Sequence, residues 1–147
     1  MEAIEDTRAT LSNYCMTYCA SVHRSSKKGD SIVEMRINGS VETALYLNKF
    51  TERLCGLLGQ PRDEMTRLLV PCNSVHTFGM KDEIDIAFIT SSGLVLEVIN
   101  NVGPNNLLSN KRASFVAERF SSERRWMFEG DRVVIGPLCL KGKVEVR

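Results

Sequence analysis

The sequence predicts a mainly β protein, a compact and mostly antiparallel β-barrel or β-sandwich with about two or three short helices, including one at the N-terminus. Roughly eight or nine short apolar runs are separated by turn residues, and they do not alternate regularly with helices as in a βαβ protein. The 147 residues, of which 43% are hydrophobic, are enough to bury one sizeable core. We therefore expect one β domain over residues 31–147 and a helical extension over residues 1–30.

The N-terminal extension has helical periodicity. Between residues 7 and 23 apolar side chains recur at three- and four-residue spacing, and Gly29 ends the pattern. Such a helix could cover a sheet edge or form a homodimer contact. Acidic residues stand where a signal peptide would need a basic start, and no run approaches the roughly 20 apolar residues of a membrane span. We therefore expect a cytoplasmic protein that does not contact a membrane.

A β-hairpin is expected next, because residues 31–37 and 41–47 are strand-like and the turn Asn38–Gly39 joins them. Apolar residues then return to helical spacing, which predicts a short helix over residues 50–58. Residues 68–70 are expected to form a brief strand.

The centre of the chain gives the strongest strand signal. Residues 84–90 and 94–100 are β-branched or apolar runs, joined by Ser91, Ser92 and Gly93. Because both faces of these runs are mostly apolar, we expect two central strands that are covered on each side. Residues 101–112 are rich in Asn, Gly, Pro and Ser and are expected to form a long loop.

The last part of the chain should add one strand over residues 113–120 and a short helix that begins at Ser121 or Ser122 and ends before Gly130. Three further apolar runs are expected as strands, over residues 132–135, 138–140 and 144–146.

Three side chains of chemically useful types flank the central hairpin: Cys72, His76 and Asp85. As metal ligands they would suit zinc or iron and leave a position open for water, although their spacing matches no established ligand pattern. As a catalytic set, Cys72 would be the nucleophile, His76 its base and Asp85 the residue that orients the imidazole.

A structural interpretation of the same residues is favoured. Strand alternation places Asp85 on a covered face beside Ala87 and Ile89, where a carboxylate needs hydrogen bonds. We expect its donors to come from the preceding loop, through His76, Thr77, Ser74 or backbone N–H groups.

The absence of several motifs argues against other classes of site. The five cysteines form no C-x-x-C pair, which argues against a disulfide framework or zinc knuckle and favours a reducing compartment. No P-loop, dinucleotide-binding, nucleophile-elbow or H-E-x-x-H pattern occurs. No cofactor is expected.

Charge is unevenly distributed although the formal net charge is only +1. Residues 30–110 contain 6 basic and 10 acidic side chains, whereas residues 111–147 contain 9 basic and 5 acidic ones. The basic segment could bind an anionic partner. Acidic residues interleave with its cations and aromatic residues are sparse, so a solvated surface is favoured and nucleic-acid binding is not expected. The candidate binding residues are Lys111, Arg112, Arg119, Arg124 and Arg125.

Several motifs follow one another in a distinctive order: Gly56-Leu57-Leu58-Gly59, Cys72-x-Ser74-Val75-His76-Thr77-Phe78-x-Met80, Ile84-Asp85-Ile86-Ala87-Phe88-Ile89 and Gly93-x-Val95. They resemble the bacterial and archaeal domain-of-unknown-function family 192. Val102-x-Pro104, Val116-Ala117-Glu118 and Gly130-Asp131-x-Val133 continue the resemblance, which runs from about residue 41 to residue 135. It implies a compact β-barrel or sandwich with small helices on one side, and no established activity.

The sequence departs from the family pattern at two places. Asn105 stands where a tryptophan often follows the proline, and residues 1–30 lie outside the resemblance. Many relatives carry an export signal or lipid anchor, so the resemblance implies a cytoplasmic branch here.

We expect a non-catalytic binding or assembly module with an unidentified protein partner, because no catalytic motif is present and the central hairpin is apolar on both faces. The basic segment and the loop over residues 101–112 are its expected contact surfaces. The alternative is a small metal-assisted or thiol-dependent enzyme that uses Cys72, His76 and Asp85.

Overall fold

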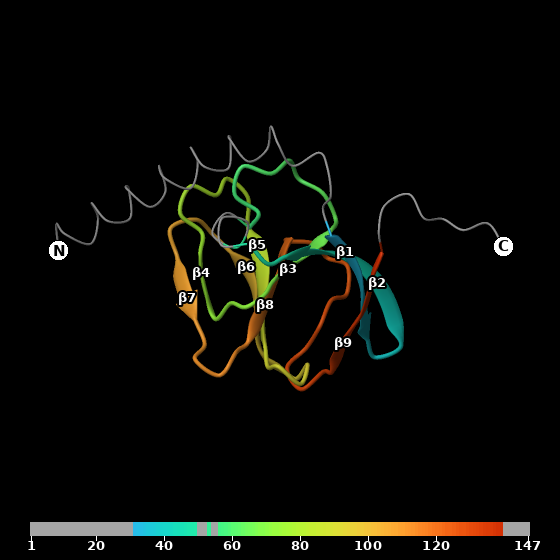
Figure 1. Cartoon of the computed structure of the whole chain (residues 1–147). Helices are drawn as coiled ribbons and strands as arrows, with labels where there is room; N and C mark the ends of the chain where they lie inside the picture. The colour runs from blue at the N-terminus through green and yellow to red at the C-terminus, as the bar shows by residue number, and fades with distance from the viewer. Residues whose placement is uncertain (1–30, 50–52, 54–55, 140–147) are drawn as a thin grey trace.

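The computed structural model describes residues 31–49, 53 and 56–139 (Figure 1). The elements of these residues are nine β-strands, so the predicted mainly β fold is confirmed. The strands are β1 (Ser31–Ile37), β2 (Ser40–Leu47), β3 (Thr66–Leu69), β4 (Ser74–His76), β5 (Ile84–Ile89), β6 (Val95–Val102), β7 (Leu107–Ser109), β8 (Phe115–Phe120) and β9 (Val133–Cys139). The expected N-terminal helix, the dimer contact assigned to it and the strand at residues 144–146 lie outside the described residues.

Seven strands form one sheet in the order β6-β5-β8-β3-β2-β1-β9, and β4 and β7 form a second, two-stranded sheet. The pairs are antiparallel except β2 with β3. The large sheet curls into a half-barrel (Figure 1), as the right-handed twist of its strands favours.

The two ends of the sheet meet at Gly93. Val133 donates its backbone N–H to Gly93 O at 2.8 Å, and Val95 donates to Asp131 O at 2.9 Å. Leu94 and Arg132 form an isolated antiparallel bridge. Gly93 has φ +89°, and a Cβ at this position would collide with the backbone oxygen of Val133. The approach of β6 to the segment before β9 therefore requires glycine.

The strand β5 is buried on both faces, as expected for a central strand. Ala87 and Ile89 belong to the apolar cluster inside the curl, together with Met35 and Trp126. The other face of β5 consists of Ile84, Ile86 and Phe88. These residues pack with Val75, Leu57 and Val116 in a second apolar cluster, on the opposite side of the sheet. The expectation of a second central strand is wrong for β6, which ends the sheet order and is only half-buried over residues 96–99.

The expected long loop over residues 101–112 is more ordered than predicted. The strand β6 continues to Val102, and β7 pairs antiparallel with β4. Thr77, which follows β4, is bonded to the segment between β6 and β7, because its Oγ1 donates to Gly103 O at 2.7 Å and accepts the N–H of Asn106 at 2.9 Å. These bonds use backbone groups 26 and 29 positions away from Thr77 along the chain, which local sequence patterns do not reveal.

The helix predicted from Ser121 or Ser122 to residue 128 is wrong, because this segment is irregular. The carbonyl oxygens of Ser122 and Arg124 accept hydrogen bonds from the Arg119 guanidinium, at 3.2 and 2.8 Å. In a helix these oxygens would accept backbone N–H groups four residues further on.

Two other elements differ in extent. Two runs predicted as separate strands, at residues 132–135 and 138–140, fall largely in the single strand β9, which ends at Cys139, the last described residue, and has a register shift opposite Val33 and Met35. The short helix expected over residues 50–58 lies mainly outside the described residues. In its described part, Arg53 donates its N–H to Lys49 O at 3.0 Å, and residues 56–59 form a turn.

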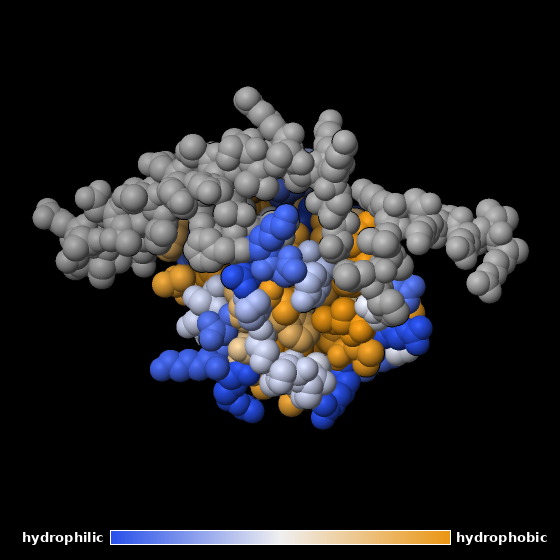
Figure 2. Space-filling view, viewed as in Figure 1, coloured by the Kyte–Doolittle hydropathy of each residue, from blue (hydrophilic) through white to orange (hydrophobic). Residues whose placement is uncertain are grey.

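The outer side of the half-barrel exposes several apolar side chains. Val41 and Val134 are 57% and 59% exposed, and both are register partners of Arg36 in β1. Apolar surface over β9 is visible on the face shown in Figure 2. Among the described residues, no helix has the length and the apolar character needed to cross a bilayer.

Candidate functional site

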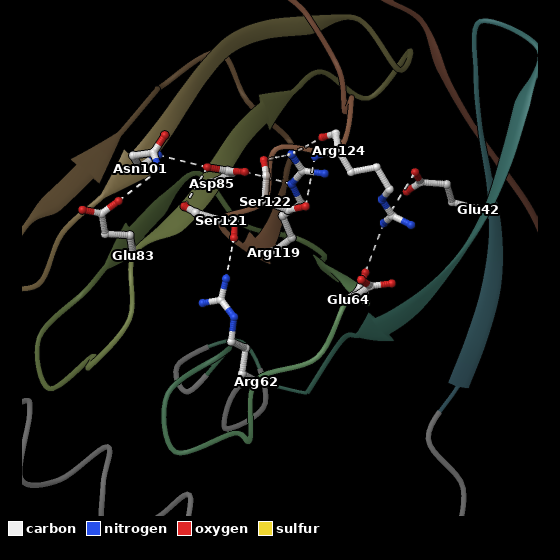
Figure 3. Close-up of polar contacts among 10 residues, drawn as sticks. All are labelled: Glu42, Arg62, Glu64, Glu83, Asp85, Asn101, Arg119, Ser121, Ser122 and Arg124. Carbon is white, nitrogen blue, oxygen red and sulfur yellow. Dashed lines mark hydrogen bonds and ion pairs between the residues drawn. The ribbon is translucent and has the colours of Figure 1, made fainter.

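Asp85 and Arg119 face each other across β5 and β8 and are buried together. They are register partners, and the side chains are 2% and 4% exposed. Arg119 donates Nε to Asp85 Oδ2 at 2.8 Å, and the other carboxylate oxygen accepts both the Ser121 hydroxyl and the backbone N–H of Asn101 at 2.9 Å (Figure 3). The carboxylate is therefore fully satisfied by an ion pair and two further hydrogen bonds.

This geometry matches part of the structural interpretation and corrects the rest. Asp85 is buried and hydrogen-bonded, but its donors come from β8, from the residue after β8 and from β6, and not from the loop that precedes β5. The reason is strand alternation: Asp85 shares the face of Ala87 and Ile89, inside the curl, whereas Val75 of β4 packs on the opposite face. The structure therefore separates Asp85 from His76.

Cys72 lies at a partly exposed position and donates its thiol to Ser74 O at 3.2 Å. Burial raises the pKa of the Cys72 thiol, which disfavours the nucleophilic thiolate. His76 stacks on Phe78 with ring centroids 5.2 Å apart, and its Nδ1 accepts the Phe78 N–H at 3.3 Å. Within the described chain, no group of three or more His, Cys, Asp or Glu side chains is arranged to hold a metal ion.

A carboxyl group that the sequence did not single out lies beside His76. Glu118 lines a cavity of about 50 Å³ whose other walls include Arg53, Ser74, His76 and Met80, and we call it the Glu118 cavity. Glu118 is 4% exposed. Burial raises its pKa to about 7, against the smaller lowering effects of the Leu57 backbone N–H and the charge of Arg67. A carboxyl that titrates near neutral pH in a cavity is a candidate for acid–base chemistry.

The turn over Glu118 depends on glycine. Gly56 has φ +48°, and a Cβ on it would lie 2.5 Å from Glu118 Oε2. The sequence offered one signal for this arrangement: in the strand predicted over residues 113–120, alternation puts Glu118 on the face of Val116 and Phe120. An acidic residue among apolar neighbours on one strand face indicates a buried carboxyl.

A larger polar pocket lies on the Arg119 side of the same strand. It has a volume of about 590 Å³, and we call it the arginine pocket; its lining residues are Arg62, Asp63, Glu64, Arg119, Phe120, Ser121, Ser122, Glu123 and Arg124. Two arginines form hydrogen bonds across the pocket, each from one wall to the other. Arg62 donates Nη2 to Ser121 O at 2.7 Å, and Arg124 donates Nη2 to Glu64 O at 3.3 Å (Figure 3).

The structure does not bring the five predicted basic binding residues into one surface. Arg119 is buried against Asp85. Lys111 and Arg112 precede β8, whereas Arg124 and Arg125 follow it, so the two exposed pairs are separated by the length of a six-residue strand, roughly 20 Å. The Arg125 guanidinium lies 5.4 Å from the ring centroid of Phe128.

Comparison with solved structures shows the fold alone. A protein from Sinorhizobium meliloti, described as a "putative transcription regulator", superposes with a TM-score of 0.64 and 15% sequence identity, over 75% of this chain and 98% of that one. A protein of unknown function from Novosphingobium aromaticivorans gives a TM-score of 0.59 at 16% identity, over 74% of this chain and 89% of that one. No family model and no curated protein sequence matches the chain.

Proposed function

We propose that this protein is a non-catalytic binding module whose ligand occupies the arginine pocket. The observation that carries the proposal is the pocket itself, which has about 590 Å³ of space and is lined by Arg119 of the buried Asp85–Arg119 ion pair. That volume is in the range of small-molecule sites, and a rigid polar wall orients a ligand without being reorganised by it.

The chemistry of the pocket favours binding over catalysis. Arginine stays protonated near neutral pH, so it is neither a general acid nor a general base there. Asp63 is held by two hydrogen bonds from Arg67, at 2.6 and 2.7 Å, and the net effect of its surroundings is to lower the pKa of this carboxyl below its ordinary value. It is therefore a weak base. Ser121 donates its hydroxyl to Asp85, which is already neutralised by Arg119.

The family resemblance is consistent with this proposal. We also propose that the chain is a member of domain-of-unknown-function family 192. The motif residues lie at defined places in the fold: residues 72–80 surround β4, residues 84–89 are β5, and Gly130 and Asp131 hydrogen-bond Val95 where the half-barrel closes. A cytoplasmic location and an N-terminal helical extension are part of the same proposal.

The test is a search for ligands by ¹H–¹⁵N NMR with the full chain and a library of small polar metabolites. We expect the amide signals of residues 62–64 and 119–124 to shift with at least one compound. Glu123→Trp, which fills the pocket from an exposed position, should abolish the shift, whereas Glu129→Trp, also exposed but outside the pocket, should retain it. A ligand whose shifts survive Glu123→Trp would contradict the proposal.

A small enzyme is the second candidate, and Glu118 rather than Asp85 is the residue that favours it. Its pKa of about 7 in a cavity beside His76 suits a general acid or base. This candidate predicts ligand-induced shifts at residues 74–76 and 118, together with turnover that Glu118→Gln removes. Turnover that persists in Glu118→Gln would exclude it.

Nucleic-acid binding is not proposed, although one structural neighbour carries a regulator's description. The exposed basic pairs lie at opposite ends of β8, and Arg119 is buried. A continuous basic surface, which nucleic-acid affinity requires, is therefore not formed by these residues.

A further inference from the structure

The arginine pocket contains a guanidinium with unused donors. A guanidinium carries five N–H groups. Arg119 directs Nε to Asp85 and Nη2 to the carbonyl oxygens of Ser122 and Arg124. Its Nη1 is buried and has no hydrogen-bond partner within the described part of the chain. Leaving such a charged donor unpaired is costly, so an acceptor supplied by a ligand would be bound favourably.

The surrounding side chains fix this guanidinium without forming a hydrogen bond to Nη1. Both Asp85 oxygens already accept hydrogen bonds, from Arg119 Nε, Ser121 and Asn101. The Trp126 ring covers one side of the guanidinium, with the ring centroid 4.8 Å from Arg119 Cζ. Arg119 is therefore held in position, and binding an acceptor would require the groups that cover Nη1 to move aside but would not require Arg119 to give up an existing bond.

Arg62 and Arg124 also line the pocket, and their guanidinium groups have N–H donors that a ligand could use. Arg62 and Arg124 are 56% and 51% exposed. Their ion pairs, with Asp82 at 3.8 Å and Glu42 at 4.0 Å, are long and solvated, so they contribute little and break easily. Figure 3 shows the two side chains extending from opposite walls, one from the segment before β3 and the other from the segment after β8.

The acidic residues of the lining restrict the shape of the ligand. Asp63 is neutralised by Arg67, whereas Glu64 and Glu123 are exposed. A group that approaches Arg119 must therefore be compact, so that its charge lies close to the arginines and away from these two carboxylates.

Building on the proposed function, we propose that the ligand of the arginine pocket presents a terminal phosphate or carboxylate group. This group accepts hydrogen bonds from Arg119 Nη1 and is flanked by Arg62 and Arg124. Planar guanidinium groups suit both anions because they offer parallel N–H donors to two oxygens.

The experiment titrates the full chain separately with inorganic phosphate and with succinate, and follows the Arg119 Nε–H signal and the amides of residues 119–124 by NMR. Phosphate, succinate or both should shift these signals, and the one that binds identifies the anionic group. Arg62→Gln and Arg124→Gln should each weaken the affinity by about tenfold, the effect of losing one charged hydrogen bond. Both positions are exposed, so the variants should fold.

Arg112→Gln is the matched control, because Arg112 is exposed and lies beyond the other end of β8. Equal weakening in Arg112→Gln would mean general charge attraction and would overturn the inference. If neither anion shifts the pocket signals while an uncharged metabolite does, the anionic ligand is excluded and the binding function stands. If no compound shifts them, the proposed function fails as well.

Discussion

Arg67 and Glu118 are register partners on β3 and β8, yet the Arg67 guanidinium is hydrogen-bonded to Asp63 and not to Glu118. Arg67 reaches both oxygens of Asp63, at 2.6 and 2.7 Å, and the Met65 carbonyl at 3.0 Å. Glu118 consequently stays buried without a directly bonded cation among the described residues, and this is why desolvation dominates its pKa.

The stability of the protein should fall as the pH rises through 7. The folded-state pKa of Glu118, about 7, is above the ordinary value for glutamate of 4.5, so the folded state favours the protonated form. Its stabilising effect is complete below the unfolded pKa and is lost as the pH rises through the folded pKa. The shift corresponds to about 3 kcal/mol of unfolding free energy.

Urea unfolding of the wild type and of Glu118→Gln between pH 5 and pH 8 measures this effect, because the difference between the two proteins removes the contributions of groups that do not interact with Glu118. We expect Glu118→Gln to gain stability relative to the wild type as the pH increases. A difference that stays constant over the range would show that Glu118 does not titrate there.

Asp85→Ala should be severely destabilising because it leaves the buried Arg119 charge without its counter-ion. The expected loss is about 3–5 kcal/mol of unfolding free energy. Asp82→Ala is the control, since Asp82 is 49% exposed and its ion pair with Arg62 is 3.8 Å long, so it should lose less than about 1 kcal/mol. Chemical denaturation of both variants gives the comparison, and equal losses would refute the role assigned to the buried pair.

Gly93→Ala should weaken the closure of the half-barrel. The new Cβ would collide with the backbone oxygen of Val133, which cannot rotate away as a side chain could. Gly130→Ala is a close control because Gly130 has the same φ of +89° but open space around the Cβ position. We expect Gly93→Ala to lower the unfolding free energy by about 2 kcal/mol more than Gly130→Ala. Thermal unfolding that ranks the two variants in the reverse order would contradict this account.

Cys72 should react slowly with iodoacetamide at neutral pH. Burial is the main cause of its raised pKa, and the charge of Glu118 adds to it. Glu118→Gln should therefore speed the alkylation of Cys72 at pH 8, where Glu118 is ionised in the wild type. Peptide mass spectrometry resolves this cysteine from the other four. Rapid modification of the wild type would instead indicate an activated thiol.

Local sequence signals predicted most strands but few of the contacts at the candidate site. The turn Asn38–Gly39 and the apolar run at residues 84–89 have short-range patterns, and both correspond to observed structure. Asp85 and Arg119 are 34 positions apart, so their pairing depends on the register of β5 against β8, which composition does not encode. The irregular segment after β8 was missed because the Arg119 guanidinium, which Asp85 of another strand holds in place, takes the carbonyl oxygens of Ser122 and Arg124 that a helix would need.

The pairing of β1 with β9 makes one of the earliest strands of the described chain depend on the latest. Until residues near 133 have left the ribosome, β1 has no partner on one side and the end of the sheet at Gly93 has nothing to close against. The half-barrel therefore completes only after β9 has been synthesised, and such long-range pairing slows folding and exposes strand edges meanwhile.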